Sequence, residues 1–421
     1  MAVNSGKEIT IFFDQVLEEF EAMTTMADEA NVFRMDKQTA QNSSETIWRP
    51  EAQIGDIQSG LDLSGLQTDI LELNVPATLD TIDNDTFTLT SLELRDKRFM
   101  QRRAKAAATK LSANLNQNMA NLVAQTGTLV VDRAALPSTY SDISACETRM
   151  DVLEISIADS RSMFLDSETY NRMAENLANK DLLGSTPEEA LRRSRIGNFA
   201  GFETFRTNFQ PLLPLTAAPA VTVTGAQFHV PVATQTVAGN TFPVDNRGMN
   251  LVVSTTTGVS AGDIFTIPGV FEVSHINKND TGNLRTFRVV DIVDGTNMLI
   301  YPRIVPLDEI GTGLTRVEGT YANVTTEAAA AASLTWLNTI NTKVSSFWRD
   351  GSVEVIAGQI AWEADMFKGA NFMRSTTSSG IEIVMATEGT AMSGVVNVRL
   401  TDYYGLVNND PQQNGILGKF S

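Results

Sequence analysis

The sequence predicts an α+β protein in which a small all-β domain is inserted into a larger domain of helices and strands. Three observations predict this class. Residues 94 to 125 form one long helical pattern, and residues 220 to 321 are rich in Val, Thr, Gly, Asn and Ile with almost no helical period. Helix and strand signals then return after that stretch, as they occur before it. A length of 421 residues corresponds to about two to three domains.

The composition is that of an acidic globular protein. Apolar residues make up 42% of the chain and charged residues 19%, with a net charge of −18. Because phosphate binding depends on Lys and Arg, so acidic a chain is a poor general binder of nucleic acid. It can still lie next to DNA without binding it tightly. The single cysteine, Cys146, excludes an internal disulfide. We find no signal peptide and no apolar run near the ~20 residues of a membrane span, so we expect a soluble protein kept in a cytoplasm.

No pattern of catalytic or metal-binding residues emerges. The two histidines, His229 and His275, stand alone in the β-rich stretch, whereas a zinc site needs several ligands at close spacing. The chain contains none of the GxSxG, GxxxxGK[ST] or GxGxxG motifs. Residues 83 to 85 (Asp-Asn-Asp) lack the later residues of a calcium loop, so we interpret them as a turn. We therefore predict no enzyme activity, no cofactor and no metal.

The N-terminal region predicts an arm followed by a hairpin. Apolar residues recur at helical spacing between positions 7 and 30, with acids between them, which predicts an amphipathic helix. From about 43 to 92 the pattern changes to short extended pieces around a Gly- and Asp-rich stretch at 55 to 65. This is typical of a long β-hairpin, which is marginally stable alone and is expected to lie on another surface.

The long helix is the strongest local signal. Apolar residues from Leu111 to Leu122 follow one helix face, and Gly127 ends the pattern. At 1.5 Å per residue the helix would be about 45 Å long, which suits a spine on which other elements lie. Its first turns carry six basic side chains, which we call the basic cluster: Arg95, Lys97, Arg98, Arg102, Arg103 and Lys105. The cluster either faces nucleic acid or an acidic neighbouring subunit, or it pairs within the chain with acids such as Glu93 and Asp96.

The rest of the chain predicts both helices and strands. Residues 163 to 165 predict a strand, and residues 166 to 178 predict a helix that follows it. Another helix is predicted to begin at Thr186, where a capping residue is followed by a proline and two acidic residues. Three prolines between 211 and 219 mark a boundary, and short strand patterns follow it. Beyond these strands we expect the following elements: a helix at 327 to 344, and strands at 353 to 356, 381 to 385 and 395 to 400.

Several stretches, in order and at similar spacing, carry a family resemblance. They are the following: Ser43-Ser44-Glu45-Thr46-Ile47-Trp48, Leu71-Glu72-Leu73-Asn74-Val75, Leu94-Arg95-Asp96, Pro187-Glu188-Glu189-Ala190, Val244-Asp245-Asn246-Arg247, Val293-Asp294-Gly295-Thr296 and Tyr321-Ala322-Asn323-Val324. With them the sequence resembles the major capsid (coat) protein of short-tailed, double-stranded-DNA bacteriophages, in the branch with an inserted β-barrel (telokin-like) domain.

The resemblance implies the Hong Kong 97 fold of tailed-phage shells. The regions it implies are these: an N-terminal arm at 1–40, an extended E-loop at 46–90, the spine helix and peripheral domain at 91–145, the first part of the axial domain at 146–219, the inserted β-barrel domain at 220–325, and the rest of the axial domain with the hinge and peripheral-domain strands at 326–421.

The resemblance also implies a structural role. The subunit would assemble with itself into hexamers and pentamers of an icosahedral procapsid, guided by a scaffolding protein and joined by a portal protein. The shell would expand when double-stranded DNA is packaged as non-specific content, and separate decoration proteins would add contacts. The protein would be assembled in the host cytoplasm and reside in the virion, with no membrane partner.

In this family a loop of the inserted domain bridges neighbouring capsomers, and the matching stretch is about 234 to 247. Asp245 and Arg247 are the expected ion-pair partners there. Residues 239 to 242 (Gly-Asn-Thr-Phe) stand where we expect more charge, which predicts a weaker or more apolar bridge. Candidates for further contacts between subunits come from the basic cluster: Arg95, Arg98, Arg102 and Arg103.

The fold's namesake cross-links its shell through a lysine in the E-loop. Between Trp48 and Arg95 this chain has no lysine, so we expect no covalent cross-link and a shell held by non-covalent contacts. Two other functions remain as alternatives. A surface adhesin would explain the Thr- and Gly-rich β stretch but not the long helix or the arm, and an acidic hydrolase would explain the carboxylates but lacks a catalytic constellation.

Overall fold

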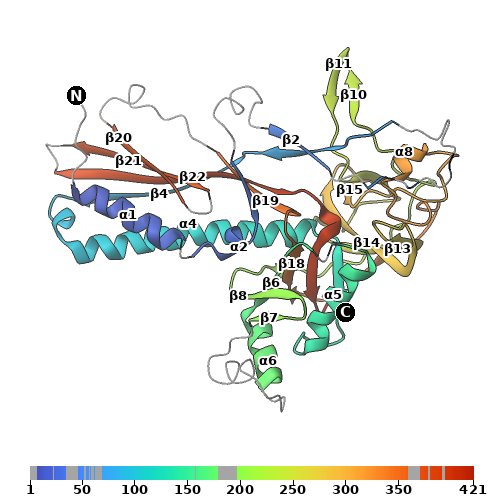
Figure 1. The fold of residues 1–421 in the computed structure, drawn as a ribbon, viewed down its shortest axis with the longest axis horizontal. Helices are drawn as coiled ribbons and strands as arrows, with labels where there is room; N and C mark the ends of the chain where they lie inside the picture. The colour runs from blue at the N-terminus through green and yellow to red at the C-terminus, as the bar shows by residue number, and fades with distance from the viewer. Residues whose placement is uncertain are drawn as a thin grey trace. The chain divides into compact units, whose positions relative to one another are not determined.

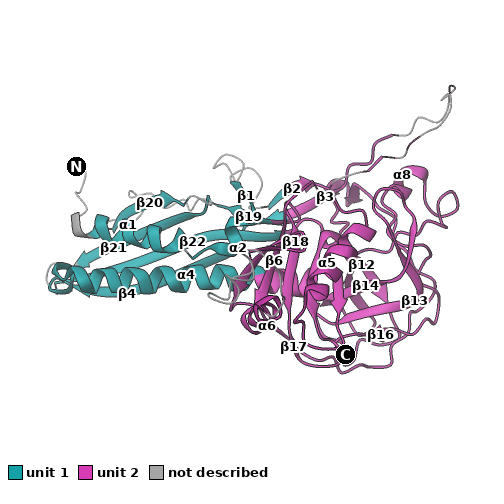
Figure 2. Ribbon diagram, turned by 60° about the horizontal axis from the view of Figure 1, so that its bottom comes forward, with its two compact units in different colours: residues 1–47, 77–119, 354–407 teal, residues 48–76, 120–353, 408–421 magenta. Residues whose placement is uncertain are grey.

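The computed structural model describes most of the chain, in two compact units (Figure 2). Unit 1 comprises residues 1–47, 77–119 and 354–407, and unit 2 comprises residues 48–76, 120–353 and 408–421. The residues that the structure describes are these: 7–21, 23–34, 46–51, 54–55, 57, 61, 69–156, 158–178, 197–358, 370–377, 380–390 and 394–421.

Unit 1 is built on a six-stranded sheet in the order β1-β19-β22-β21-β20, with β4 also paired to β22. Its strands are β1 Asn31–Arg34, β4 Thr81–Thr90, β19 Val353–Ala357, β20 Ala370–Thr376, β21 Glu382–Thr390 and β22 Val395–Asn408. β4 and β22 are antiparallel, from Thr90 opposite Val395 to Thr81 opposite Tyr404.

Helices cover one face of this sheet. They are α1 Lys7–Glu21, the short α2 Thr25–Asp28, and α4 Lys97–Thr126, which follows the 3₁₀ turn η1 Glu93–Arg95 (Figure 1). The rings of Phe12 on α1 and Phe87 on β4 meet edge to face with centroids 5.8 Å apart, and Asn114 on α4 donates a hydrogen bond to Asp83 on β4. Alternate residues of β4 therefore face the helices, while Thr86 and Thr88 are exposed on the other face.

Unit 2 contains a second six-stranded sheet, in the order β5-β23-β18-β6-β8-β7. Its strands are β5 Leu129–Asp132, β6 Arg161–Asp166, β7 Asn198–Phe199, β8 Phe202–Thr207, β18 Ser345–Arg349 and β23 Asn414–Gly418, and the turn η2 is Pro411–Gln413. Helices α5 Tyr140–Val152 and α6 Ser167–Ala178 pack on this sheet through a core that includes Ile143, Cys146, Met173 and Phe347.

Unit 2 also contains the β-rich segment, residues 220–336, which has a hydrophobic core of its own around Phe265, Phe287 and Trp336. Its main sheet has the order β12-β15-β14-β13-β16. The elements are β10 Thr234–Val237, β11 Asn240–Pro243, β12 Met249–Val252, β13 Ile264–Val273, β14 Asp280–Ile292, β15 Asn297–Tyr301, α8 Arg316–Gly319 and β16 Thr335–Trp336.

Two short ladders each join segments that are distant in the sequence. β9 Leu212–Leu213 pairs antiparallel with β17 Thr342–Lys343, so the chain enters and leaves the β-rich segment at one place. β2 Thr46–Pro50 pairs with β3 Asn74–Thr78 as the β2–β3 hairpin. The next strand, β4, belongs to the sheet of unit 1. How the ranges implied by the family resemblance divide the chain into capsid domains stays a prediction.

Several sequence predictions are confirmed at the level of secondary structure. The amphipathic helix near the N-terminus is α1 with α2, the long helix is α4, and the strand and helix at 163 to 178 are β6 and α6. The strands predicted near the C-terminus are also present, as are those predicted in the β-rich stretch from residue 251 onward. The strand predicted at 221 to 223 is wrong, because these residues form only isolated β-bridges. The helix expected from Thr186 lies outside the described residues, as does most of the stretch at 55 to 65.

The helix predicted at 327 to 344 is wrong. The backbone N–H groups of Ala328, Ala331 and Leu334 donate to the carbonyl oxygens of Gln227, Val223 and Val221, at 2.9–3.0 Å, rather than to the preceding helical turn. The alanine run therefore extends the β-rich segment. Alanine has the highest helix propensity, but hydrogen bonding to distant parts of the chain outweighs it here.

Two further differences concern short stretches. Residues 83 to 85 were expected as a turn but lie within β4, and α5 was not predicted, although its start carries a capping box between Thr139 and Asp142. In the part of the chain that the structure describes, no helix is long and apolar enough to cross a membrane.

Candidate functional site

The histidines and the cysteine occupy separate places, and the two histidines are half-buried whereas Cys146 is buried. His229 Nε2 lies 3.0 Å from Asn246 Oδ1, and burial lowers the pKa of His229. Burial and the nearby Arg285 and Lys278 charges lower the pKa of His275 to about 3. Burial raises the pKa of the Cys146 thiol, so it is not a nucleophile at neutral pH. Within the described ranges, no three His, Cys, Asp or Glu side chains are placed to hold a metal ion.

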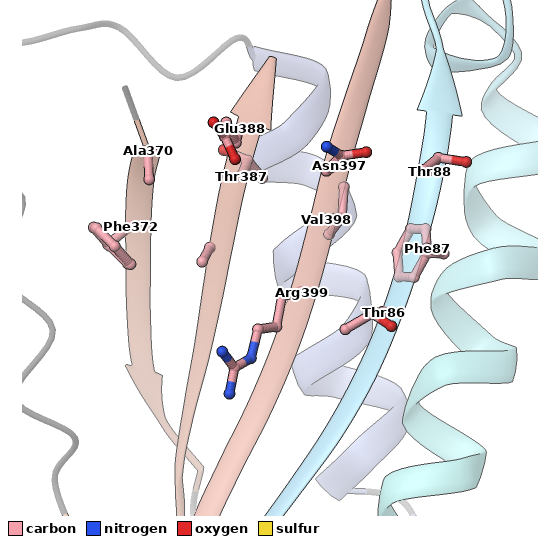
Figure 3. A pocket seen from close by; sticks show the side chains of 11 residues that line it. Thr86, Phe87, Thr88, Ala370, Phe372, Thr387, Glu388, Asn397, Val398 and Arg399 are labelled. Atoms are coloured by element: carbon pink, nitrogen blue, oxygen red, sulfur yellow. The ribbon is translucent and has the colours of Figure 1, made fainter. Parts of the chain in front are cut away.

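The open face of the unit 1 sheet is hollowed by a pocket of about 470 Å³, between strands β4, β22, β21 and β20 (Figure 3). Its charged side chains are Glu388 on β21 and Arg399 on β22, and Arg399 Nε donates to Asn84 Oδ1 at 2.9 Å. The remaining lining is mostly Thr, Ala and aromatic side chains. The lining thus combines one acidic and one basic side chain with hydroxyl and apolar groups.

The structure divides the basic cluster into two groups. Four of its side chains, in η1 and the first turns of α4, are exposed, and no carboxylate in the described part of the chain lies at ion-pair distance from them. They are Arg95, Lys97, Arg98 and Arg102. The others pair within the chain. Lys105 Nζ lies 3.1 Å from Glu19 Oε2, and Arg103 Nη2 lies 2.9 Å from Asp85 Oδ2. Pairing within the chain is therefore confirmed for Arg103 and Lys105, with Asp85 and Glu19 as the partners. An outside partner for the other four side chains stays a prediction.

Arg103 is held from two sides. Besides the contact with Asp85, its guanidinium lies 4.0 Å from the centroid of the Phe87 ring. Both partners belong to β4, in the stretch that was expected to contain a turn. Arg103 thus fastens the first turns of α4 to the sheet of unit 1, and its charge is largely used inside the subunit.

Strands β10 and β11 form a separate two-stranded hairpin, the β10–β11 hairpin, which stands out from the β-rich segment (Figure 1). Its side chains are exposed except for that of Pro243, which is half-buried. Val237 and Phe242 each expose 53% of their surface. A polar two-stranded ribbon with two exposed apolar side chains contributes little to the core, and it is suited to contact another surface.

Asp245 and Arg247 lie at the base of this hairpin and bind each other. Arg247 Nη2 and Asp245 Oδ2 are 2.7 Å apart, and Arg247 Nη1 donates to the carbonyl oxygen of Asn408 at 2.8 Å. Burial would lower the pKa of Arg247, but the hydrogen bonds to Asp245 raise it above its usual value. The two residues form the expected ion pair within one chain, and their part in a contact between capsomers stays a prediction.

Comparisons with known proteins identify the family. The family model described as "P22 coat protein - gene protein 5" matches residues 1–418. Among solved structures, the chain is similar to the CUS-3 coat protein I-domain, with 36% identity over 28% of this chain and 96% of that chain and a TM-score of 0.23. It is also similar to a chain from Mycobacterium phage Che8 (9% identity, 91% of this chain and 88% of that chain, TM-score 0.42). The capsid of cyanophage P-SCSP1u matches with 9% identity over 93% of this chain and 86% of that chain, with a TM-score of 0.43.

The family match covers nearly the whole chain, and the mixed helix-and-strand architecture fits the Hong Kong 97 fold. Nothing in the comparisons supports the adhesin alternative. The exposed β10–β11 hairpin and the four exposed side chains of the basic cluster are thus surfaces of a shell-forming subunit. The chain belongs to the P22 coat protein family, and it is a major capsid protein that forms the icosahedral shell of a virion.

Proposed function

We propose that this subunit assembles, guided by a scaffolding protein, into a procapsid of hexamers and pentamers that expands as double-stranded DNA is packaged. A portal protein and decoration proteins are its further partners, and the subunit is structural rather than catalytic. The absence of lysine between Trp48 and Arg95 supports a shell without covalent cross-links of the E-loop kind. Contacts between capsomers then carry the stability of the shell.

The observation that carries this proposal is the exposure of the β10–β11 hairpin. Its strands pair with each other, and their side chains find little to pack against within the subunit. The Asp245–Arg247 pair fixes its base, so the ribbon leaves the β-rich segment in a defined direction. Phe242 and Val237 supply apolar area that a neighbouring capsomer would bury. This agrees with the apolar bridge that residues 239 to 242 predict.

The direct test replaces Phe242 with serine. Burying a phenylalanine stabilises a contact by about 1.5–3 kcal/mol, and one shell repeats the contact many times. We expect F242S subunits to fold normally and to form shells that dissociate at lower urea or temperature, measured by light scattering and negative-stain microscopy. Val293 is also about half exposed, in a turn of the same segment, and V293S is the matched control. Equal shell stability in F242S and V293S would exclude the hairpin contact.

The exposed part of the basic cluster supports a second contact, with acidic groups of an adjoining subunit. Reversing Arg98 and Arg102 together to glutamate should block shell assembly and leave the free subunit folded. Lys110→Glu, about two turns further along the same helix, is the control and should assemble. Arg103→Glu breaks the intrachain pair with Asp85 and should lower the stability of the free subunit itself. Normal shells from R98E/R102E would contradict the proposed contact.

A further inference from the structure

Arg303 lies where two hairpins of unit 2 meet. It follows β15, and its side chain is 2% exposed. Its Nη2 and Nη1 atoms donate to Glu51 Oε1 at 2.7 Å and Glu51 Oε2 at 3.0 Å, which is a bidentate pair. Nη1 also donates to the carbonyl oxygen of Asn246, and the guanidinium lies 5.2 Å from the centroid of the Tyr321 ring. One guanidinium thus contacts three separate segments of the chain.

The first of these segments is the loop end of the β2–β3 hairpin, where Glu51 and Leu73 follow and precede the two strands, and we call this end the root of its connecting loop. Glu51 comes directly after β2, and its backbone N–H donates to the carbonyl oxygen of Leu73 at 2.8 Å, across the hairpin. The hydroxyl of Tyr321 donates to the carbonyl oxygen of Leu71 at 2.6 Å. Arg303 therefore holds one side of this root directly, through Glu51, and supports the other side through Tyr321.

The second segment is the root of the β10–β11 hairpin. The backbone N–H of Arg303 donates to the carbonyl oxygen of Arg247 at 3.1 Å, next to the bond with Asn246. Asn246 in turn binds both backbone groups of Val232, just before β10. A single β-bridge joins Asn74, at the start of β3, to Asp245. The two hairpin roots are therefore adjacent, and Arg303 binds both.

The surroundings make the pair of Arg303 and Glu51 costly to break. Burial would lower the pKa of Arg303, but the charge and hydrogen bonds of Glu51 raise it. The other charged groups that line the same small cavity are Lys278 and Asp410, and burial raises the pKa of Asp410. Loss of Glu51 would leave a guanidinium out of water without its principal counter-charge, and such a site relaxes by moving its backbone.

We propose that Arg303 is a positioning residue that couples the roots of the two hairpins, so that ordering one root stabilises the other. A contact made by the β2–β3 hairpin would then favour the conformation in which the β10–β11 hairpin makes its own contact. The coupling is a property of the free subunit. It can therefore be tested separately from the contacts between capsomers, on which its use in a shell depends.

The test is hydrogen–deuterium exchange of the unassembled subunit, with Glu51→Gln as the variant. We expect exchange to rise about tenfold in the peptides around residues 71–76 and, equally, in those covering 232–247, because hydrogen bonds to charged groups contribute that much or more. The matched control is Asp159→Asn. It removes a carboxylate 2.8 Å from Arg349, and it should leave both hairpin roots unchanged.

Coupling must be reciprocal, which supplies a second variant. Asp245→Asn, at the base of the β10–β11 hairpin, should speed exchange around Glu51 and residues 71–76. If E51Q also shows faster exchange in α4 and β14, that variant is globally unfolded. The result for D245N then decides whether the two hairpin roots are coupled. The proposal is overturned if each variant changes exchange in its own hairpin root alone.

Discussion

Glu272 is the carboxylate whose loss should destabilise the free subunit most. It lies on β13 with its side chain 1% exposed, and its Oε1 atom is 2.7 Å from Arg149 Nη1 on α5. Its Oε2 atom is 4.0 Å from Arg285 Nη1, and the hydroxyl of Thr281 donates to Oε1 at 3.0 Å. Burial lowers the pKa of Arg285 to about 10, and the Glu272 charge opposes this shift. One carboxylate thus balances two guanidinium groups that have little access to water.

Removing that carboxylate leaves both positive charges without their counter-charge. Breaking a buried ion pair by deleting one partner costs about 3–5 kcal/mol, a large part of the roughly 5–15 kcal/mol by which a native protein is stable. We therefore expect Glu272→Ala to lower the free energy of unfolding by about 3–5 kcal/mol. Glu272→Gln keeps the hydrogen-bond acceptor and should cost less than alanine.

The assay is urea-induced unfolding of the free subunit, followed by the fluorescence of its four tryptophans. Among them, Trp336 lies in the core of the β-rich segment and Trp348 on β18 of the other sheet of unit 2. The control is Glu168→Ala on α6, which removes an exposed pair with Arg172 at 2.6 Å and should cost no more than about 0.5 kcal/mol. A loss below about 1 kcal/mol for E272A, close to that of the control, would refute the reasoning from burial.

Two further predictions concern single positions. A Cβ atom added to Gly415 would lie 1.9 Å from the carbonyl oxygen of Leu129 on the neighbouring strand, so Gly415→Ala should lower the melting temperature of the subunit, whereas Gly295→Ala, with open space around it, should not. Burial, and then the charge of Asp83, raise the pKa of Asp402 well above its usual value. A raised pKa of an acid means that stability is lost as pH rises through the folded-state value, so Asp402→Asn should raise the melting temperature at neutral pH and have little effect near pH 3. A pH-independent difference between wild type and D402N would contradict this.

Local sequence patterns were sufficient to predict helices and strands wherever residues close in the sequence determine the conformation of the chain. Leu111, Leu115 and Met119 repeat on one face of α4, and all three are buried. The strands of the β-rich segment were predicted from β-branched residues between turn residues, and all but the one at 221 to 223 are present. The same reasoning was wrong at 327 to 344, because the hydrogen-bond partners of those alanines lie about a hundred residues earlier in the chain, near Val223 and Gln227.

The sites depended more strongly on contacts between distant residues. The basic cluster was evident as six basic residues between positions 95 and 105. Its division into paired and exposed side chains depended on Asp85 and Glu19, which the sequence does not mark as partners. Arg303 and Glu51 are 252 positions apart, and neither stands in a motif. An isolated charge in a strand pattern is the one sequence feature that could have drawn attention to Arg303, since such a charge must be paired when the strand is buried.

The burial of Cys146 has a practical consequence for all of these experiments. The chain has one thiol, which lies in the core of unit 2 and is shielded from reagents while the subunit is folded. A thiol-specific reagent would therefore report unfolding of that core with no background from the native state. A cysteine introduced at exposed Asn240, at the turn of the β10–β11 hairpin, would carry a fluorescent label at a single site without removal of the native cysteine. Each subunit of a shell could then be labelled at the same point, and the hairpin's surroundings followed from free subunit to finished particle.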